Sequence, residues 1–188
     1  MEKQPRFFDE GDFTSAHEKI HLWAIEQFPK FNAYVKLKLI SDMEDDNDKK
    51  ERLSKILSEK GWLGDYSKSS FHVMPEYELE PVLNGYPPVY PDCILNIKYD
   101  QIIRDDYRKH SIQKVVIEIK SHIDSFEPVM RQMQIYRSRL PSVIFMPHTI
   151  FMPPGIFMLI YPEKYSKYDT IFKSQDIEIV HCPDSLIE

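Results

Sequence analysis

The stretch that most constrains the fold is the apolar run from Lys114 to Lys120, whose centre reads Val115-Val116-Ile117-Glu118-Ile119. β-branched residues favour strands, because their side chains pack well on a pleated surface. A second apolar run, Tyr90 to Ile97, comes before it and opens with Pro91-Asp92. We therefore predict two neighbouring strands whose ends bring Asp92, Glu118 and Lys120 to the same place.

Helix-like and strand-like segments alternate along the rest of the chain. The pattern turns helical from Thr14, with Ile20 and Ala24 on the apolar face, and we expect this helix to end at Phe28 or Pro29. This order predicts an α/β fold, a central mixed β-sheet flanked by helices. The other predicted elements are a strand or helix turn at Tyr34 to Ile40, a helix around Leu53, Ile56 and Leu57 ending at Gly61, a strand at Phe71 to Leu83 with a turn at Asn84-Gly85, a charged connection at Lys98 to His110, a helix capped by Asp124 or Ser125, strands at Ser142 to Met146 and Gly155 to Tyr161, a helix at Glu163 to Lys173 and a strand at Ile177 to His181.

Length and charge limit the possible functions. A chain of 188 residues is long enough for one well-buried core and too short for two, so we expect a single domain over residues 1–188. The formal net charge of −6 argues against a broadly basic surface that holds nucleic acid by bulk electrostatics. Any contact with phosphate groups would therefore have to be local.

Cysteine usage and hydropathy indicate the compartment. Cys93 and Cys182 are too few for a four-cysteine metal or iron–sulfur site, and they fit reduced, buried thiols. The start of the sequence has no apolar signal core, and no apolar run reaches the roughly 18 residues that indicate a membrane helix. We expect a cytoplasmic protein, or one in the host cytoplasm if it is viral, with no membrane partner.

The acidic residues and the lysine at the strand ends suit phosphodiester chemistry. Cleavage needs a hydroxide at neutral pH and a cation beside the phosphate, which Mg²⁺ or Mn²⁺ supplies when bound by oxygen ligands. The carboxylates of Asp92 and Glu118, with the carbonyl of Ile119, are candidate ligands. Lys120 lies two residues after Glu118 and so faces the same side of the strand, where its ammonium group can orient water or stabilise developing charge.

These residues carry a resemblance to a known family. Pro91-Asp92 followed by Glu118-Ile119-Lys120 resembles the PD-(D/E)xK nuclease superfamily, with its two hallmark strands joined by a variable connection. Gln132 and Tyr136 reproduce the QxxxY motif that RecB-like members carry on the helix after the lysine strand. At this spacing both lie on one helix face. The resemblance covers the chain from about residue 14 to residue 140.

The resemblance implies a Mg²⁺- or Mn²⁺-dependent deoxyribonuclease that favours single-stranded DNA or strand ends. Asp92, Glu118 and Lys120 would be catalytic, and Gln132 and Tyr136 would position DNA near the metal. No iron–sulfur cluster is expected, because the four cysteines of the cluster-bearing relatives are missing.

Further residues are candidates for the same site. RecB-like nucleases tend to have a metal-binding histidine in the first helix, which His17 resembles. Glu18 and His21 are alternatives to it. Arg131, with Arg137 and Arg139 on the same helix, would provide a local phosphate track.

Several alternatives stay open. A module of the same fold that binds nucleic acid without cutting it is one of them. A Holliday-junction resolvase or a restriction-type endonuclease is another, and both act on duplex DNA as symmetric dimers. Taken singly, Asp92 is a common turn residue, Glu118 and Lys120 are typical of a charged edge strand, and Gln132 and Tyr136 suit an ordinary helix surface. The sequence does not predict the oligomeric state, and a role in DNA repair or in a mobile element is suggested by size alone.

Overall fold

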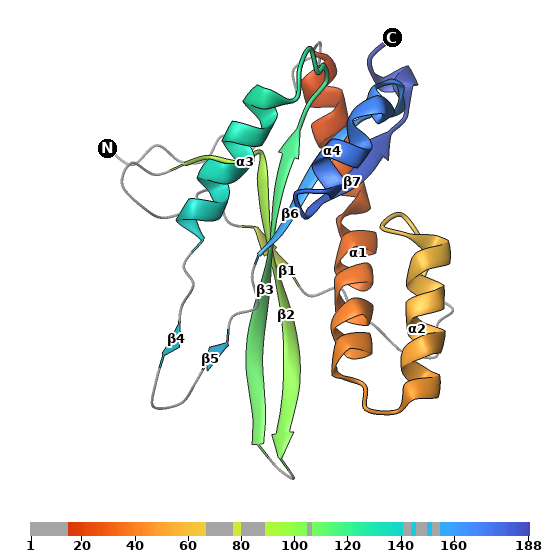
Figure 1. Ribbon diagram of the computed structural model, residues 1–188, viewed down its shortest axis with the longest axis vertical. Coiled ribbons are helices and arrows are strands. Elements are labelled where there is room, and N and C mark those ends of the chain that lie inside the picture. Colours follow the sequence, from red (N-terminus) through yellow and green to blue (C-terminus); the bar gives the residue numbers. More distant parts are fainter. Residues whose placement is uncertain are drawn as a thin grey trace.

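The computed structural model describes residues 15–66, 77–79, 89–104, 107–140, 144–145, 150–151 and 155–188. Within these residues a five-stranded sheet has β1 (Tyr77–Leu79), β2 (Cys93–Arg104), β3 (Tyr107–Ile119), β6 (Ile156–Pro162) and β7 (Ile177–Cys182) side by side in that order (Figure 1). β1, β2 and β3 pair antiparallel, whereas β3, β6 and β7 pair parallel. β4 (Ile144–Phe145) and β5 (Ile150–Phe151) form a separate pair. The predicted mixed sheet is confirmed.

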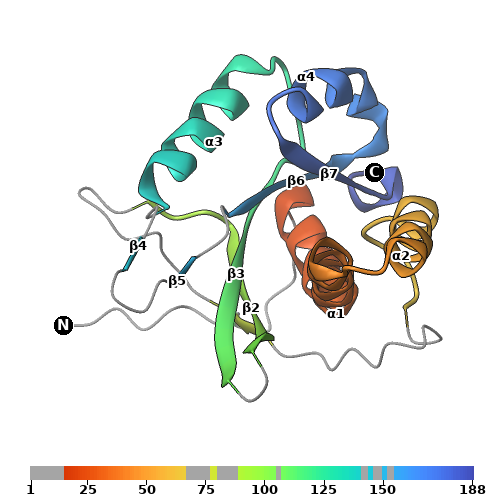
Figure 2. The same cartoon turned by 60° about the horizontal axis from the view of Figure 1, so that its bottom comes forward.

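Helices cover both faces of the sheet. Alternate residues of a strand point to opposite faces, and apolar strand residues on both faces are buried under helices. One face packs against α1 (Ala16–Met43), and α2 (Asn47–Lys60) packs against α1 in turn. The other face packs against α3 (Glu127–Arg139) and α4 (Asp169–Lys173), as Figure 2 shows from below. The predicted α/β arrangement, a central sheet flanked by helices, is therefore confirmed.

The first helix is longer than predicted. α1 passes through Pro29 and continues to Met43, so the predicted end at Phe28 or Pro29 is wrong, and Tyr34 to Ile40 is helix rather than strand. A proline inside a helix costs about 3 kcal/mol, whereas burying one large apolar side chain contributes about 1.5–3 kcal/mol. Pro29 is exposed, and the apolar stripe on the opposite side continues beyond it. The stripe residues, each at most 1% exposed, are Ile20, Ala24, Phe28, Phe31 and Val35.

β2 and β3 form a hairpin that is longer than the sequence predicts. Their pairing runs from Cys93 opposite Ile117 to Arg104 opposite Tyr107, so the predicted charged connection, Lys98 to His110, is mostly strand. Over most of this length the arm has no third strand beside it in the described part of the chain (Figure 1). A charged sequence does not exclude an antiparallel strand, because such a strand needs only one apolar face. Reading charge as a loop signal was therefore wrong here.

The start of α3 also differs from the prediction. The residue before the helix is Phe126, which forms no side-chain cap, and a proline occupies the first turn. Proline favours this position, because its fixed φ angle suits the helix start and the missing N–H needs no partner there. Asp124 binds His122 instead of capping the helix, so the predicted cap by Asp124 or Ser125 is wrong.

Most of the remaining predicted elements are confirmed within the described residues. α2 buries Leu53 and Leu57 and ends at Gly61, whose φ of 58° lies in the region that glycine tolerates best. The predicted helix from Glu163 to Lys173 has two parts, the 3₁₀ helix η1 (Glu163–Tyr168) and α4; a second 3₁₀ turn, η2 (Asp184–Leu186), follows β7. The turn at Asn84-Gly85 and parts of the predicted strands at 71–83 and 142–146 lie outside the described residues.

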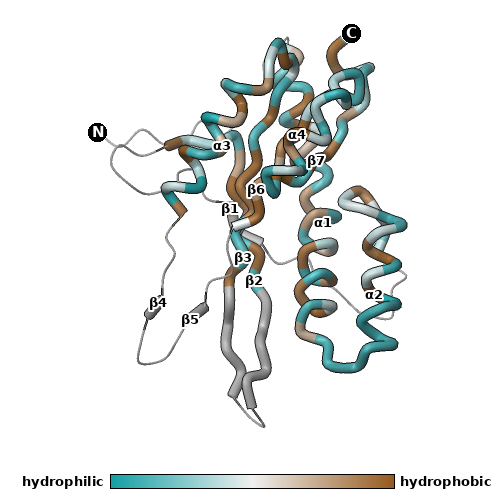
Figure 3. Tube along the Cα trace, viewed as in Figure 1, coloured by the Kyte–Doolittle hydropathy of each residue, from teal (hydrophilic) through white to brown (hydrophobic). Residues whose placement is uncertain are grey.

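Hydropathy follows these layers. In Figure 3 the hydrophobic segments lie along β6 and the adjoining parts of β2 and β3, whereas α2 is largely hydrophilic. Cys93 and Cys182 are free and buried, as the sequence predicts. None of the helices in the described ranges has the length and apolar character needed to cross a membrane.

Candidate functional site

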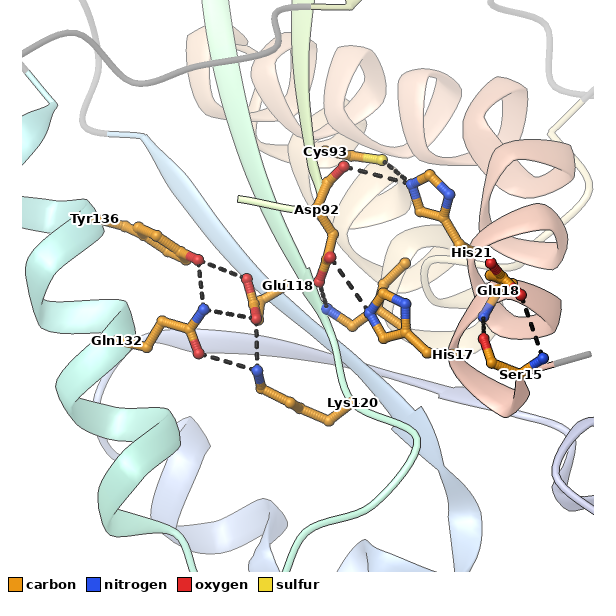
Figure 4. Close-up of polar contacts among 11 residues, drawn as sticks. Ser15, His17, Glu18, His21, Asp92, Cys93, Glu118, Lys120, Gln132 and Tyr136 are labelled. Atoms are coloured by element: carbon orange, nitrogen blue, oxygen red, sulfur yellow. Dashed lines mark hydrogen bonds and ion pairs between the residues drawn. The ribbon is translucent and has the colours of Figure 1, made fainter. Parts of the chain in front are cut away.

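The predicted site residues come from four elements that meet at one edge of the sheet (Figure 4). Because β2 and β3 are antiparallel, the start of β2 lies beside the end of β3, and the pairing of Cys93 with Ile117 sets Asp92 next to Glu118. α1 contributes His17 and α3 contributes a polar face. The structure therefore brings together residues that are far apart in sequence.

Asp92 is held by contacts on both of its carboxylate oxygens. Oδ2 accepts a 2.7 Å hydrogen bond from the backbone N–H of Ile119, and Oδ1 lies 3.3 Å from Nε2 of His17. The N–H and C=O of one residue in an extended strand point to the same neighbouring strand. The Ile119 carbonyl is thus directed to the side of the strand on which Asp92 lies.

Glu118 is the centre of a closed network of side chains. It is only 4% exposed, and its Oε1 accepts hydrogen bonds from Lys120 Nζ at 2.6 Å and from Gln132 Nε2 at 2.7 Å. Its Oε2 accepts from the Tyr136 hydroxyl at 2.7 Å. We call Glu118, Lys120, Gln132 and Tyr136 the Glu118 network. A buried carboxylate needs such partners, because burying an unpaired charge is very costly.

The network has internal bonds as well. Gln132 Oε1 accepts from Lys120 Nζ at 2.9 Å, and Gln132 Nε2 lies 2.6 Å from the Tyr136 hydroxyl. Gln132 and Tyr136 are four residues apart on α3, so both point toward β3. The resemblance assigns these residues to DNA positioning, which stays a prediction. In the structure their polar atoms contact Glu118.

The electrostatics of the site are those of two neighbouring carboxylates. Burial raises the pKa of Glu118, and the negative charge of Asp92 raises it further, while Lys120 and Tyr136 oppose the shift. The hydrogen bond to Asp92 raises the pKa of His17 above its ordinary value. Burial first and Glu118 second raise the pKa of Tyr136, so its hydroxyl stays a donor. The two carboxylates thus raise the pKa values of the titratable groups around them, and the Lys120 ammonium group offsets part of their charge.

The three candidates for a further metal ligand on α1 differ in position. His17 reaches Asp92, as described above. His21 Nε2 lies 3.4 Å from the backbone oxygen of Asp92 and 3.2 Å from Cys93 Sγ. Glu18 instead completes a capping box with Ser15, at 3.2 Å in both directions. Its carboxylate is directed back to the helix start, and the structure does not bring it to Asp92 (Figure 4).

The chemical nature of the donors fits a hard divalent cation. Asp92, Glu118 and the Ile119 carbonyl offer oxygen atoms, which Mg²⁺ and Mn²⁺ prefer, and the repulsion between the two carboxylates favours a cation near them. In the described part of the chain, however, no three side chains of the types His, Cys, Asp and Glu are already grouped for metal binding. The hydrogen bonds on Glu118 would have to rearrange before it binds an ion.

The predicted phosphate track is only partly available. Arg131 is exposed beside Gln132 on α3. Arg137 instead ties α3 to the turn before β7, because its Nη2 donates to the carbonyl oxygens of Gln175 and Asp176. Its guanidinium also lies over the Phe157 ring, 5.0 Å from the centroid. Arg137 thus has a structural role.

Sequence reasoning missed one residue that contacts the site. Cys93 bonds with His21, and burial raises the pKa of its thiol to about 12, so it stays protonated. Two features of the sequence could have predicted this contact. Cys93 directly follows Asp92. His17 and His21 are four residues apart, which places both rings on one face of α1, where they stack with their centroids 6.4 Å apart.

Comparisons of the chain with protein-family models, with curated protein sequences and with solved structures find no match. The Glu118 network and the contacts of Asp92 are therefore the basis for a functional conclusion.

Proposed function

We propose that the chain is a metal-dependent nuclease that hydrolyses phosphodiester bonds of DNA, with single strands or strand ends as the preferred substrate. The observation that carries this proposal is the position of Lys120, whose Nζ lies 2.6 Å from Glu118 Oε1 and 2.9 Å from Gln132 Oε1. Asp92 lies at the same sheet edge, where Oδ2 accepts the Ile119 N–H. An acid, a lysine and a second acid are thus fixed together.

Burial argues against the ordinary explanation for these residues. A charged edge strand would have Glu118 and Lys120 in solvent, whereas Glu118 is 4% exposed. Replacing buried ion pairs by apolar residues is often neutral or stabilising, so a buried pair is weak evidence for a purely structural role. Perturbed carboxylates beside a cation are typical of functional sites.

Asp92, Glu118 and the Ile119 carbonyl would hold Mg²⁺ or Mn²⁺, with His17 as the candidate fourth donor. The chemistry that such an ion supplies when bound is polarisation of the phosphate and a lowered pKa of bound water. No iron–sulfur chemistry is proposed.

The protein's own groups have separate tasks. The Lys120 side chain is 26% exposed, so a phosphate can approach it and its ammonium group can stabilise the charge that develops there. Tyr136 and Gln132 orient Glu118, and the Ile119 N–H orients Asp92. Arg131 adds an exposed positive charge on α3 for a phosphate of the bound strand.

The proposal is tested by cleavage of labelled single-stranded and duplex DNA in Mg²⁺ or Mn²⁺. We expect Lys120→Ala and Asp92→Ala to lower the rate by about 100-fold or more, as the loss of one transition-state contact does. Lys55→Ala is the matched control, because Lys55 is exposed on α2 and pairs only weakly with Glu59 at 3.9 Å. Unchanged cleavage in Lys120→Ala or Asp92→Ala would refute the proposal.

A binding module that does not cut is the second candidate, and one observation favours it. Both oxygens of Glu118 already accept hydrogen bonds from the protein, three in all. Titration of Mn²⁺ into the protein, followed by calorimetry, separates the two candidates. A nuclease should bind the ion and lose this binding in Glu118→Ala, whereas a module without catalysis should give no heat that depends on Glu118.

A further inference from the structure

A second group of side chains lies at the same edge of the sheet as Lys120. β3 and β6 are parallel neighbours, with Ile119 opposite Ile160, so the loop after β3 and the helix η1 after β6 leave the sheet at the same edge (Figure 1). The loop carries His122 and Asp124, and η1 carries Lys164, Tyr165, Lys167 and Tyr168. This group is separate from the Glu118 network.

The two tyrosines of η1 are fixed against the loop. The Tyr165 hydroxyl hydrogen-bonds His122 Nδ1, and the two rings meet edge to face with centroids 5.3 Å apart. The Tyr168 hydroxyl donates to the backbone oxygen of Asp124 at 3.0 Å. Both rings also pack against the hydrophobic core between the sheet and the helices α3 and α4. The rings are therefore held in place at the surface.

Each tyrosine ring carries a lysine ammonium group. Lys164 Nζ lies 5.3 Å from the centroid of Tyr165, and Lys167 Nζ lies 4.9 Å from that of Tyr168. Both lysines are exposed, and a cation over a ring is weakly bound at an exposed site. Stacking of a nucleic-acid base on a ring is stronger. A base can therefore displace the ammonium group, which then becomes available to the adjacent phosphate.

We propose that Lys164, Tyr165, Lys167 and Tyr168, which we call the tyrosine–lysine platform, bind single-stranded nucleic acid. Bases stack on the two rings and the two ammonium groups contact phosphates. The inference rests on the proposal that the neighbouring Glu118 site handles nucleic acid, and it adds a separate binding surface that selects single strands over duplexes.

The spacing of the platform favours a single strand over a duplex. In a 3₁₀ helix residues three apart lie above one another, so the two lysine–tyrosine pairs repeat after about 6 Å. The bases of a duplex strand follow one another at about 3.4 Å. Only a strand whose bases are unpaired and spread apart offers one base face to each ring.

The charge around the platform sets how strongly salt should affect binding. Glu163 on η1 and Asp124 on the loop offset part of the positive charge, and Asp124 Oδ1 lies 2.5 Å from His122 Nε2. At most two phosphates are neutralised, so we expect log K to fall with log salt with a slope of about −1.4 or shallower. Stacking is the main source of binding.

Fluorescence anisotropy with the full chain and a labelled single strand of about 12 nucleotides tests the proposal, in chelator so that no cleavage occurs. We expect the double variant Lys164→Gln/Lys167→Gln to raise Kd about fivefold and Tyr165→Leu about tenfold. Tyr165→Phe keeps the ring and should bind like the unchanged protein. Thermal unfolding by circular dichroism shows whether Tyr165→Leu remains folded.

The matched control is Lys49→Gln/Lys55→Gln, which removes the same charge from α2. Binding as tight as that of the unchanged protein in Lys164→Gln/Lys167→Gln, or a duplex bound as tightly as the single strand, overturns the proposal. Cleavage in Mg²⁺ that is the same in the platform variants and the unchanged protein would leave the nuclease proposal standing and reject the platform. Platform-dependent binding without cleavage under any metal would reject the nuclease and support the platform.

Discussion

Tyr136→Phe is the substitution that probes the Glu118 network most directly. It removes one hydroxyl and leaves the ring, which is 3% exposed and packs between α3 and the sheet. The hydroxyl donates to Glu118 Oε2 at 2.7 Å and lies 2.6 Å from Gln132 Nε2. The variant therefore takes away one of the three donors of a buried carboxylate without opening a cavity.

The expected loss of stability is about 1.5–3 kcal/mol near neutral pH, the usual contribution of a hydrogen bond to a charged group. Because the pKa of Glu118 is raised above 4.5 in the folded protein, its carboxyl favours the folded state most at pH below 4.5, and this contribution is lost as pH rises through the folded pKa. The Tyr136 bond limits this loss by stabilising the charged form. The variant should hence differ most from the unchanged protein above the folded pKa, and by about 1 kcal/mol less at acid pH, where a neutral bond is lost.

Urea unfolding in chelator at about pH 7.5 and about pH 4 measures both values. Tyr161→Phe is the matched control, because Tyr161 is fully buried and donates to Asp169 Oδ1 at 2.5 Å. The pKa of Asp169 is lowered from 3.8, a net result in which its hydrogen bonds to Tyr161 and His181 outweigh burial, the largest single contribution. The effect of Tyr161→Phe should therefore change with pH over a lower pH range than the effect of Tyr136→Phe. An effect of Tyr136→Phe that is absent, or that is equal at both pH values, contradicts the assignment.

Three further results are expected. Pro29→Ala should raise the free energy of unfolding by about 1–3 kcal/mol in urea unfolding, because alanine restores a helix hydrogen bond in the middle of α1; no gain would mean that α1 is already relaxed around proline. His17→Gln should destabilise the metal-free protein by less than about 1 kcal/mol at about pH 6, since this ion pair with Asp92 is half-exposed. The difference should vanish as pH rises through the raised pKa of His17, and a difference that grows with pH would refute it. Leu53→Ala should cost about 2–5 kcal/mol in thermal or urea unfolding, as Leu53 is 1% exposed between α1 and α2, and a cost below about 1 kcal/mol would show that α2 is loosely docked.

Much of the fold follows from short-range pattern. The runs around Val115 to Ile119 and Gly155 to Tyr161 are strands in the structure, because both faces of the sheet are covered and every position there can be apolar. Short-range pattern gave the wrong prediction where packing between distant residues determines the secondary structure. The sequence around Pro29 contains a local helix breaker, and only the burial of Phe31 and Val35 against the sheet reveals why the helix continues.

The positions of the site residues could be predicted from the sequence, but their hydrogen-bond partners could not. Strand direction and helix period were enough to predict that Asp92, Glu118 and the α3 face lie together, which the structure has. The partner of each hydrogen bond depends on the distance between α3 and β3, which the sequence does not encode locally. The contact between Cys93 and His21 likewise depends on how α1 packs, whereas the capping box of Ser15 and Glu18 follows from their local spacing of three and is confirmed.

The two oxygens of Glu118 are not equivalent, and this bears on how the site works. Oε1 is shared by Lys120 and Gln132, whereas Oε2 accepts from Tyr136. Lys120 keeps a second acceptor, Gln132 Oε1, at 2.9 Å. The bond between Lys120 and Oε1 can thus open while Tyr136 still orients the carboxylate and Gln132 still holds the ammonium group near the sheet edge. Oε1 would still accept from Gln132 but would have one lone pair available to a cation, and Lys120 would be available to a phosphate. If the proposed function holds, Gln132 and Tyr136 would in this way act on DNA through Glu118 and Lys120.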